Sequence, residues 1–319
     1  MRHRYLLRMV IGLMGIPFVL VAILPVVGHA YDLKPVKVAQ DTYVLIGFME
    51  DFTLKNGGNI VNTGFIVTKE GVVVIDSGPS KNYGMAMREA IARISDKPVI
   101  RVYVTHFHPD HFLGNQAFDA SIISALPGTI QGISKDGPGF LDNMYLLVDK
   151  QMRGTDIQLP GLQVREGTEH FGKHHLQVLA LAGHTDSDLA LFDKTTGVLF
   201  AGDLVFNNRA LTTPHANIDQ WVDSLDRLEE LAFTVLVPGH GPVSQDATPI
   251  RQTRKHLMWL VRLMQFSSLR GMHMNEVMNA EIPQEFKKTA LIRKELSRSV
   301  THLYPEYESA SLQLIGTEN

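Results

Sequence analysis

The sequence contains no cysteine among its 319 residues. Disulfide bonds and thiolate metal ligands are therefore excluded, so any bound metal must be held by nitrogen and oxygen donors. The G-x-S-x-G pattern that presents a serine nucleophile is also absent, and no other feature indicates a serine hydrolase. Repeats and low-complexity runs are missing too, which favours a globular protein with a large core in one or two domains.

The first thirty residues differ in character from the rest. Arg2, Arg4 and Arg8 precede a charge-free apolar run from Met9 to Val27, and "GHA" follows. This order is typical of a secretory signal peptide cleaved after Ala30, so we expect a periplasmic or secreted protein with no stable membrane association. The 19-residue run is also nearly long enough to span a bilayer. An uncleaved membrane anchor is therefore the alternative.

The chain has no basic run, and its net charge is negative. Acidic residues outnumber basic ones 33 to 30, and removal of residues 1–30 would leave 27 basic residues and a formal charge of −6. A negatively charged protein without a basic stretch is a poor candidate for binding nucleic acid. We expect a small-molecule substrate instead.

Strand-like and helix-like patterns alternate twice along residues 31–248. Segments 36–77 and 176–203 carry β-branched and apolar runs broken by glycine, which indicates hairpins. Three helical patterns lie between or after them. They are a helix capped by Ser80 with an apolar stripe reaching Ile94, a helix over residues 140–152 and a helix capped by Asp219. The chain reads as helical from Pro249 to the end. This order predicts an α/β (α+β) protein with two sheets sandwiched between helical layers.

The most distinctive segment is "VYVTHFHPDHFLGNQAF", residues 102–118. A strand-like run ends at Thr105, and His106, His108, Asp110 and His111 follow within six positions. Loops at strand ends present binding groups on a rigid scaffold. The first two histidines can point one way from an extended backbone, while the other two residues follow the proline bend. Two ligand pairs on one tight loop suit two metal ions a few ångströms apart.

Three later positions complete a candidate ligand set. His184 in "LALAGHT", Asp203 in "VLFAGD" and His240 in "VLVPGHG" each follow a strand-like run and a glycine, which permits a tight turn. A carboxylate has two oxygens, so Asp203 can bridge two ions. Nitrogen and oxygen donors of this kind favour Zn²⁺, with iron or manganese as alternatives. A single histidine after a strand is more often an ordinary hydrogen-bonded side chain, but four clustered donors with three more at strand ends make coincidence improbable.

These motifs resemble those of the metallo-β-lactamase-fold hydrolases. "THFHPDH" matches the family's H-x-H-x-D-H signature, the three later motifs follow in the expected order, and "VVVIDSG" matches the family's upstream aspartate motif at Asp76. The resemblance covers residues 36–243 and implies an αβ/βα four-layer sandwich with metals at one edge. It places this domain at residues 31–248 and a helical extension packed on the same domain at 249–319.

The resemblance also implies a role for each ligand candidate. Asp76 would fix the ligand loop from behind. The implied zinc ligands are His106, His108 and His184 for one ion, Asp110, His111 and His240 for the other, and Asp203 bridging both.

Departures from the pattern narrow the resemblance. The main β-lactamase subclass has a cysteine where Asp203 stands, whereas a bridging aspartate is similar to the thiolester hydrolases of the glyoxalase II branch. The wording of "NGGNIVNTGFIVT" and "PHANIDQW" resembles exported zinc metallohydrolases associated with quinoprotein dehydrogenase systems, which are related to a sulfur-oxidation-associated hydrolase. That narrower resemblance implies a quinoprotein partner.

The expected function is an exported dinuclear zinc metallohydrolase that uses a metal-bound hydroxide to cleave an ester, thiolester or lactam-like bond. Asp110 could also orient the hydroxide, and His215 in "TTPHAN" is the best candidate for a substrate contact. His170, His174 and His175 are expected in a loop above the metals, as solvated side chains. Two alternatives are a mononuclear iron oxygenase of the persulfide-dioxygenase type and a non-catalytic, metal-binding accessory protein.

Overall fold

The computed structural model describes residues 31–316, and the predicted signal peptide lies outside the described residues. Twelve strands within this range form a seven-stranded and a five-stranded sheet. The first sheet contains, in order, β1 (Val36–Ala39), β2 (Thr42–Leu45), β3 (Thr63–Val67), β4 (Val72–Ile75), β5 (Val99–Tyr103), β6 (Ile123–Ala125) and β7 (Leu162–Gln163). The second contains β8 (Gly167–Phe171), β9 (His174–Leu181), β10 (Asp188–Asp193), β11 (Val198–Phe206) and β12 (Val235–His240).

Each sheet combines antiparallel hairpins with parallel strands. Strands β1 to β4 form the predicted meander, and β5, β6 and β7 then add in parallel. In the second sheet β8 to β11 are antiparallel, and β12 lies parallel to β11. The carboxyl ends of β5 and β12 carry the motif loops.

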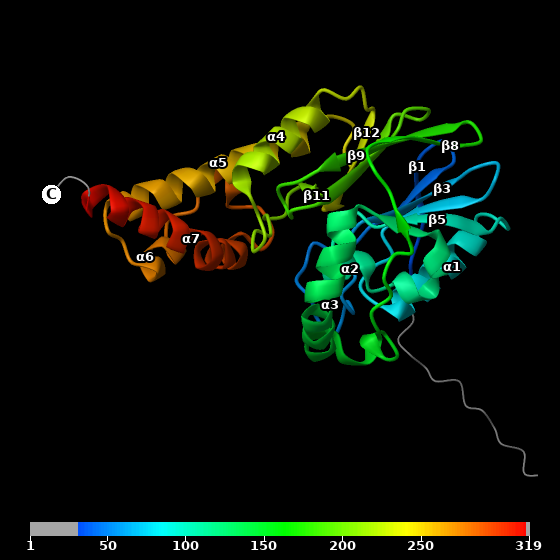
Figure 1. Cartoon of the computed structure of the whole chain (residues 1–319), viewed down its shortest axis with the longest axis horizontal. Coiled ribbons are helices and arrows are strands. Elements are labelled where there is room, and N and C mark those ends of the chain that lie inside the picture. The colour runs from blue at the N-terminus through cyan, green and yellow to red at the C-terminus, as the bar shows by residue number, and fades with distance from the viewer. Residues whose placement is uncertain (1–30, 317–319) are drawn as a thin grey trace, which may run out of the picture.

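Three hydrophobic clusters define the layers. The helices in the described residues are α1 (Lys81–Ala92), α2 (Pro109–Phe112), α3 (Pro127–Val148), α4 (Ile218–Glu229), α5 (Thr248–Leu269), α6 (Met274–Met278) and α7 (Ile292–Gly316). One cluster joins the first sheet to α1 and α3, one joins the second sheet to α4 and α5, and a third fills the space between the sheets. Figure 1 shows α1 and α3 on the opposite side of the sheets from α4. The expected αβ/βα four-layer sandwich is confirmed.

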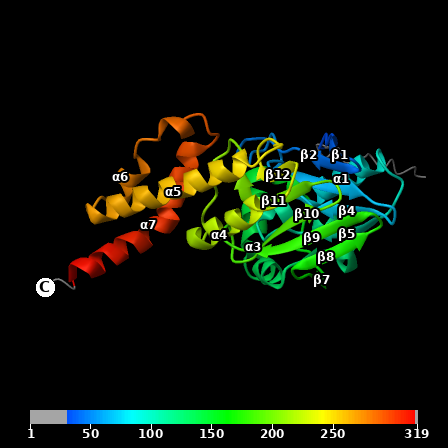
Figure 2. The ribbon, with the colours of Figure 1, turned by 90° about the horizontal axis from the view of Figure 1, so that it is seen from above.

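The C-terminal helices form an arm with a core of its own. The first half of α5 packs on β11 and α4, and Ile250 and Leu257 belong to their cluster. Its second half packs with α6 and α7 around residues such as Leu260, Met264 and Tyr304. The arm extends away from the sandwich (Figures 1 and 2). Within residues 31–316 we find no helix that combines the length and the apolar character needed to cross a membrane.

Local predictions needed correction at several helix ends. The predicted helix over residues 140–152 begins much earlier, at Pro127, and ends at Val148. Several glycines and Pro138 interrupt its apolar pattern, so its first half did not read as helical. Ser80 caps α1 as predicted, since its hydroxyl accepts a hydrogen bond from the Tyr83 N–H, but α1 ends at Ala92, before Ile94. Asn217, rather than Asp219, caps α4.

A buried histidine on α5 should make the stability of the protein depend on pH. His256 on α5 is buried, and its ring stacks on Phe286 with centroids 5.0 Å apart. Burial lowers the pKa of His256 from 6.5 to about 4, so the folded state favours the neutral ring. The contribution of this ring to the free energy of unfolding should therefore be fully present above pH 6.5. About 3 kcal/mol of it should be lost as the pH drops toward 4. Urea unfolding of wild type and His256→Phe at both pH values measures this. An equal acid-induced loss in the two proteins would contradict it.

Candidate metal centre

The ligand loop begins where β5 ends. Its first part is extended, and His108 is the N-cap residue of the short helix α2 with Pro109 at its first position. Asp110 and His111 follow within the first turn of α2. The proline bend therefore separates the four side chains into two pairs, and all four are buried. The two pairs of side chains on this tight loop point in two directions, as the sequence suggested.

The other three predicted residues come from the second sheet. His184 lies in the turn after β9, and His240 is the last residue of β12. Asp203 does not follow a strand end as predicted, because β11 continues to Phe206. The local change of direction comes from Gly202, which has φ of 52° at a register shift between β11 and β12. The structure thus brings all seven residues to one place.

One glycine of the site leaves space for a neighbouring side chain instead of forming a turn. Gly239 precedes His240, and a Cβ atom added to it would lie 2.0 Å from Asp203 Oδ1. Its backbone is not in the left-handed region, so the glycine makes room for the carboxylate rather than a turn. Any side chain at this position would displace Asp203.

The donor atoms form two groups. The first donor group comprises His106, His108 and His184 together with Asp203, and the second donor group comprises Asp110, His111 and His240. Within each group one ligand atom per residue lies within 4.8 Å of the others. This division matches the one implied by the family resemblance.

Asp203 lies between the two groups. Its Oδ2 is 3.4 Å from His184 Nε2 and 3.2 Å from His240 Nε2, while its Oδ1 is 3.2 Å from His111 Nε2. Two donors of one tetrahedral zinc ion, each about 2.1 Å from the metal, lie about 3.4 Å apart. The carboxylate is therefore placed to serve an ion on either side.

Unpaired polar atoms also fit a pair of cations. His111 Nε2 and Asp203 Oδ1 are buried and face one another without forming a hydrogen bond. A buried polar atom left unsatisfied costs free energy, which coordination to a cation would offset. The donor set, the spacing and these unpaired atoms all fit a dinuclear metal centre.

The electrostatics of the groups point the same way. Burial lowers the pKa of His106, His108 and His184 well below the ordinary value, so their rings are neutral and keep a lone pair for a cation. Burial raises the pKa of Asp203, but His240 and His111 outweigh this and hold it well below its usual range. The first donor group therefore presents neutral imidazoles beside an ionised carboxylate. Burial lowers the pKa of His111 in the second donor group, but Asp203, Asp76 and Asp110 outweigh this and raise it well above its usual value, so a cation bound there would replace a proton.

Fixed partners orient the outer nitrogens of the histidines. His240 Nδ1 donates a hydrogen bond to the Ile60 carbonyl over 2.7 Å, and His106 Nδ1 lies 3.1 Å from the Thr105 hydroxyl. A carbonyl can only accept, so the His240 proton sits on Nδ1 and the lone pair of Nε2 faces Asp203 and Asp110. The rings are therefore set before any cation arrives.

Asp76 lies behind the ligand loop, where the sequence predicted it. Its two oxygens accept hydrogen bonds from the Thr105 N–H at 2.8 Å and the Thr105 hydroxyl at 2.9 Å. His111 Nδ1 lies 2.8 Å from Asp76 Oδ2. Asp76 has φ of 56°, a conformation that aspartate and asparagine tolerate better than most residues. It holds the loop and the His111 ring together.

The Asp76 carboxylate should contribute to metal affinity through its contact with His111. Asp76→Asn keeps the shape and the tolerance of positive φ but replaces an acceptor by an amide N–H₂ that cannot accept from His111 Nδ1. We expect zinc affinity to fall by about 10- to 100-fold, the range for partners of ligating histidines. Competition of each protein with a chromogenic chelator measures the affinity. Unchanged affinity would show that the carboxylate does not orient His111.

Sequence reasoning missed Asp188, which fixes the turn of His184. Its Oδ2 accepts hydrogen bonds from the backbone N–H groups of His184 and Thr185, at 3.0 and 2.9 Å, and its Oδ1 accepts from the Thr185 hydroxyl at 2.7 Å. The signal was present in "GHTDSD", because an aspartate commonly bonds to nearby backbone N–H groups in a turn.

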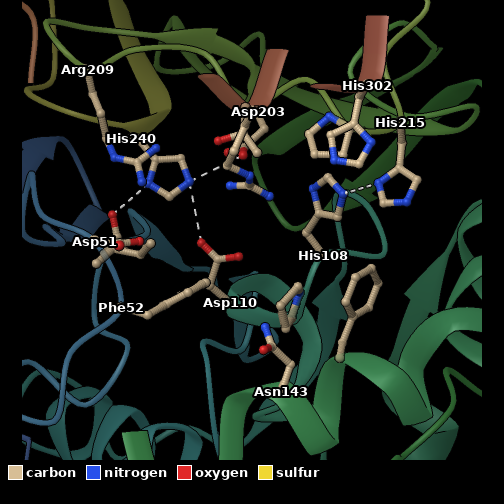
Figure 3. A pocket seen from close by; sticks show the side chains of 16 residues that line it. Asp51, Phe52, His108, Asp110, Asn143, Asp203, Arg209, His215, His240 and His302 are labelled. Atoms are coloured by element: carbon tan, nitrogen blue, oxygen red, sulfur yellow. Dashed lines mark hydrogen bonds and ion pairs between the residues drawn. The ribbon is translucent and has the colours of Figure 1, made fainter. Parts of the chain in front are cut away.

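Residues of both donor groups line a pocket of about 360 Å³, among them His108, Asp110, Asp203 and His240. Phe52 and Phe140 line its walls, and His215 stands at its mouth with Nδ1 2.9 Å from His108 Nε2 (Figure 3). His215 was predicted at the substrate side, and its position suits that role. The pocket lies in the size range of small-molecule sites.

Several further pocket residues were not predicted, among them three that can carry positive charge. Arg209 follows β11, and Arg298 and His302 come from α7. No local pattern connects these positions, which lie about ninety residues apart in the chain. Arg209 alone had a usable signal, since it follows a strand that carries a ligand.

The histidines of the β8–β9 hairpin lie elsewhere. His170 is on β8, and His174 and His175 are on β9, at the end of that strand remote from His184. They do not form a loop above the metals. His174 is fully buried and lies 2.7 Å from Asp193, so the prediction of a solvated side chain was wrong for it.

The comparison with known families decides the classification. The Metallo-beta-lactamase superfamily profile matches residues 56–240, more than half of the chain. This chain belongs to the metallo-beta-lactamase superfamily. The match spans the ligand loop and all three later ligand candidates, and homologues in this superfamily are metal-dependent hydrolases.

Relatives within the superfamily are named for different hydrolytic activities. The chain is 28% identical over 184 residues to metallo-beta-lactamase IND-1 of Chryseobacterium indologenes, a match covering 56% of this chain and 71% of the relative. It is 28% identical to the acyl-coenzyme A thioesterase MBLAC2 of Homo sapiens, covering 57% and 74%. It is 40% identical over 224 residues to a linear primary-alkylsulfatase of a Pseudomonas species, covering 56% of this chain but only 41% of that protein.

Solved structures of the superfamily share the fold. A metallo-beta-lactamase from Pontibacter korlensis matches with a TM-score of 0.56 and 22% identity, covering 71% of this chain and 99% of that one. A beta-lactamase domain protein from Burkholderia ambifaria matches with a TM-score of 0.62 and 19% identity, covering 86% and 88%.

Proposed function

We propose that this protein is a dinuclear zinc hydrolase that cleaves an ester, thiolester or lactam-like bond in a small molecule. The observation that carries the proposal is the position of Asp203 between two complete donor groups. Nothing in a mononuclear site would require the second donor group of Asp110, His111 and His240. The superfamily relatives named as a lactamase and a thioesterase support bond cleavage of this kind.

The chain's residues would hold the two ions as the donor groups divide them, with Asp203 shared. A pair of bound divalent cations would polarise the oxygen of the bond to be cleaved and lower the pKa of a water molecule toward neutrality. Cysteine and the G-x-S-x-G pattern are absent from the sequence, in keeping with water as the nucleophile.

Asp110 is placed to act on the attacking water. Its Oδ2 faces the second donor group, 3.4 Å from His240 Nε2 and 3.7 Å from His111 Nε2. Its Oδ1 is then available to accept a hydrogen bond from the water, fix its direction of attack and take up its proton. Figure 3 shows the carboxylate on the pocket floor below His240.

The remaining pocket residues bind and enclose the substrate. Phe52 and Phe140 supply apolar walls that limit the access of bulk water. His215 contacts His108 and reaches the same space, so it is placed to touch the substrate on the side of the first donor group.

Export to the periplasm and association with a quinoprotein dehydrogenase are part of the same proposal. They rest on residues 1–30 and on the narrower sequence resemblance. A mononuclear iron oxygenase and a metal-binding accessory protein are the competing functions.

Metal counting and hydrolase profiling together test the proposal. Protein purified without added metal is analysed for zinc and iron, and zinc-loaded protein is assayed on esters, thiolesters, β-lactams and sulfate esters, with chelator-stripped protein as the control. We expect two zinc ions per chain and turnover that returns on reloading. One iron per chain would favour the oxygenase. Two zinc ions without turnover, but with tight binding to a quinoprotein, would favour the accessory role.

A further inference from the structure

His215 contacts a ligand candidate of the first donor group from outside that group. Its Nδ1 lies 2.9 Å from His108 Nε2 (Figure 3). The other ring nitrogen of His108, Nδ1, lies 3.1 Å from His106 Nε2 and 2.8 Å from His184 Nε2. His108 therefore turns one nitrogen toward the other donors of its group and the other nitrogen toward His215.

The first donor group sets the direction of this hydrogen bond. A histidine that binds a cation through Nδ1 must keep the lone pair of that atom free, so its proton lies on Nε2. The Nε2–H of His108 then donates, and His215 Nδ1 accepts. Within residues 31–316, His215 is the one hydrogen-bond partner of His108 Nε2. Partners of this kind fix the ring orientation of a ligating histidine.

Two phenylalanines pack against this pair of histidines. The ring centroid of Phe107 lies 5.2 Å from that of His108 and 5.2 Å from that of His215. The Phe140 centroid lies 5.9 Å from His108 and 6.1 Å from His215, and all four contacts are edge-on. Packing restricts where the two rings can lie, but a phenylalanine offers no acceptor. The hydrogen bond depends on His215 itself.

The segment that carries His215, residues 209–217, is fixed to the arm and is called the strap below. At its start, Arg209 forms a parallel bridge with Ala290. Further along, the hydroxyls of Thr213 and Ser299 hydrogen-bond at 2.8 Å, and both side chains are buried. Ser299 belongs to α7. The strap is therefore held to the arm at two points.

The end of the strap is fixed beside the first donor group. The backbone N–H of Asn217 donates to the Gly183 carbonyl at 2.9 Å, and Gly183 directly precedes His184. Asn217 also caps α4. His215 thus lies between two contacts with the arm and one contact with the turn of a ligand candidate. The arm and the sandwich together determine its position.

We propose that His215 is a positioning residue for the first metal ion, which fixes the His108 ring through this hydrogen bond and is itself held in place by the arm through the strap. The arm would then contribute to metal binding, although none of the seven ligand candidates lies on it. This role is separate from the substrate contact proposed above, because it requires no substrate. It rests on the proposed function only in that the first donor group binds a cation.

Two substitutions of His215 separate the hydrogen bond from the packing. In His215→Asn the amide oxygen can accept in place of Nδ1, but the aromatic ring is lost. His215→Phe keeps a ring against Phe107 and Phe140 but has no acceptor. We expect affinity for the first zinc ion to fall by about 10- to 100-fold in His215→Phe and to stay within about threefold of wild type in His215→Asn. A role in packing alone predicts the opposite order.

Metal binding is measured directly and without substrate. Competition with a chromogenic chelator gives the zinc affinities, and Co²⁺ in place of Zn²⁺ gives a visible absorption band that reports the geometry of coordination. We expect His215→Phe to alter this band and His215→Asn to keep it. His302→Phe is the matched control, since His302 lines the same pocket but, within the described residues, forms no hydrogen bond with a ligand candidate. Its zinc affinity and band should equal those of wild type.

A second pair of variants tests the contribution of the arm. Thr213→Val keeps the size of the side chain but removes the hydrogen bond to Ser299, whereas Thr213→Ser retains a hydroxyl. We expect Thr213→Val to lower affinity for the first zinc ion by about fivefold, as for one net hydrogen bond, and Thr213→Ser to keep it. These variants leave His215 unchanged, so they also serve if His215→Phe does not fold.

The possible results lead to different conclusions. Wild-type affinity in His215→Phe, or equal losses in His215→Phe and His215→Asn, would overturn the positioning role. Wild-type affinity in Thr213→Val would remove the arm from it. Absence of hydrolysis in zinc-loaded wild type would count against the proposed function, while the metal affinities would still decide the role of His215.

Discussion

Asp203→Asn is expected to leave the protein unable to hold two metal ions. The carboxylate lies within 3.4 Å of donors from both groups, and the substitution removes its charge and one of its two oxygens. Loss of an outer partner alone costs about 10- to 100-fold in metal affinity, so loss of a shared ligand should cost at least about 100-fold at each site. Zinc per chain after dialysis should fall from two toward zero, and hydrolysis should fall with it.

Asp193→Asn is the matched control for this variant. Asp193 is also a buried aspartate of the second sheet, and it bonds to His174 away from the metal centre. This substitution should lower the free energy of unfolding while the zinc content stays at two per chain. If Asp203→Asn retained both ions, the bridging role of this carboxylate would be wrong.

Asp110→Asn is expected to lower kcat by about 10²- to 10⁴-fold, the usual contribution of a group that handles a proton in the transition state. Asparagine keeps the size of the side chain but cannot accept a proton. The assay is run with zinc titrated to saturation, because Asp110 also belongs to the second donor group. This separates loss of metal from loss of the proton acceptor.

Asp142→Asn provides the comparison, since this aspartate is exposed on α3, outside the pocket lining. Its kcat should equal that of wild type. A kcat for zinc-saturated Asp110→Asn that matched Asp142→Asn would remove Asp110 from the proposed chemistry and leave it a ligand only.

The ligand set could be predicted from sequence because its members are marked locally. The spacing of His106, His108, Asp110 and His111 is legible within six residues, and the later three follow apolar runs. Strand ends on one edge of a sheet bring such residues together whatever the loops between them do. The order of the motifs was therefore enough to predict the fold and the candidate metal centre.

Local structure was harder to predict wherever tertiary packing overrode propensity. The first half of α3 contains several glycines and Pro138, and its helical state depends on packing against the first sheet. Asp203 was expected at a strand end but lies within β11, because the bend comes from Gly202 and the pairing with β12. Gly239 was explained by a turn, whereas it leaves space for the Asp203 carboxylate.

The amino-acid order alone determined which side chains could ligate metal, because that information lies in residue type and short spacing. Only the folded chain decided what else reaches the pocket. Arg209 and Arg298 belong to segments that meet through the bridge at Ala290 and the packing of α7. Contacts between distant segments leave no periodic trace in either one, since they depend on how the sandwich and the arm pack in three dimensions.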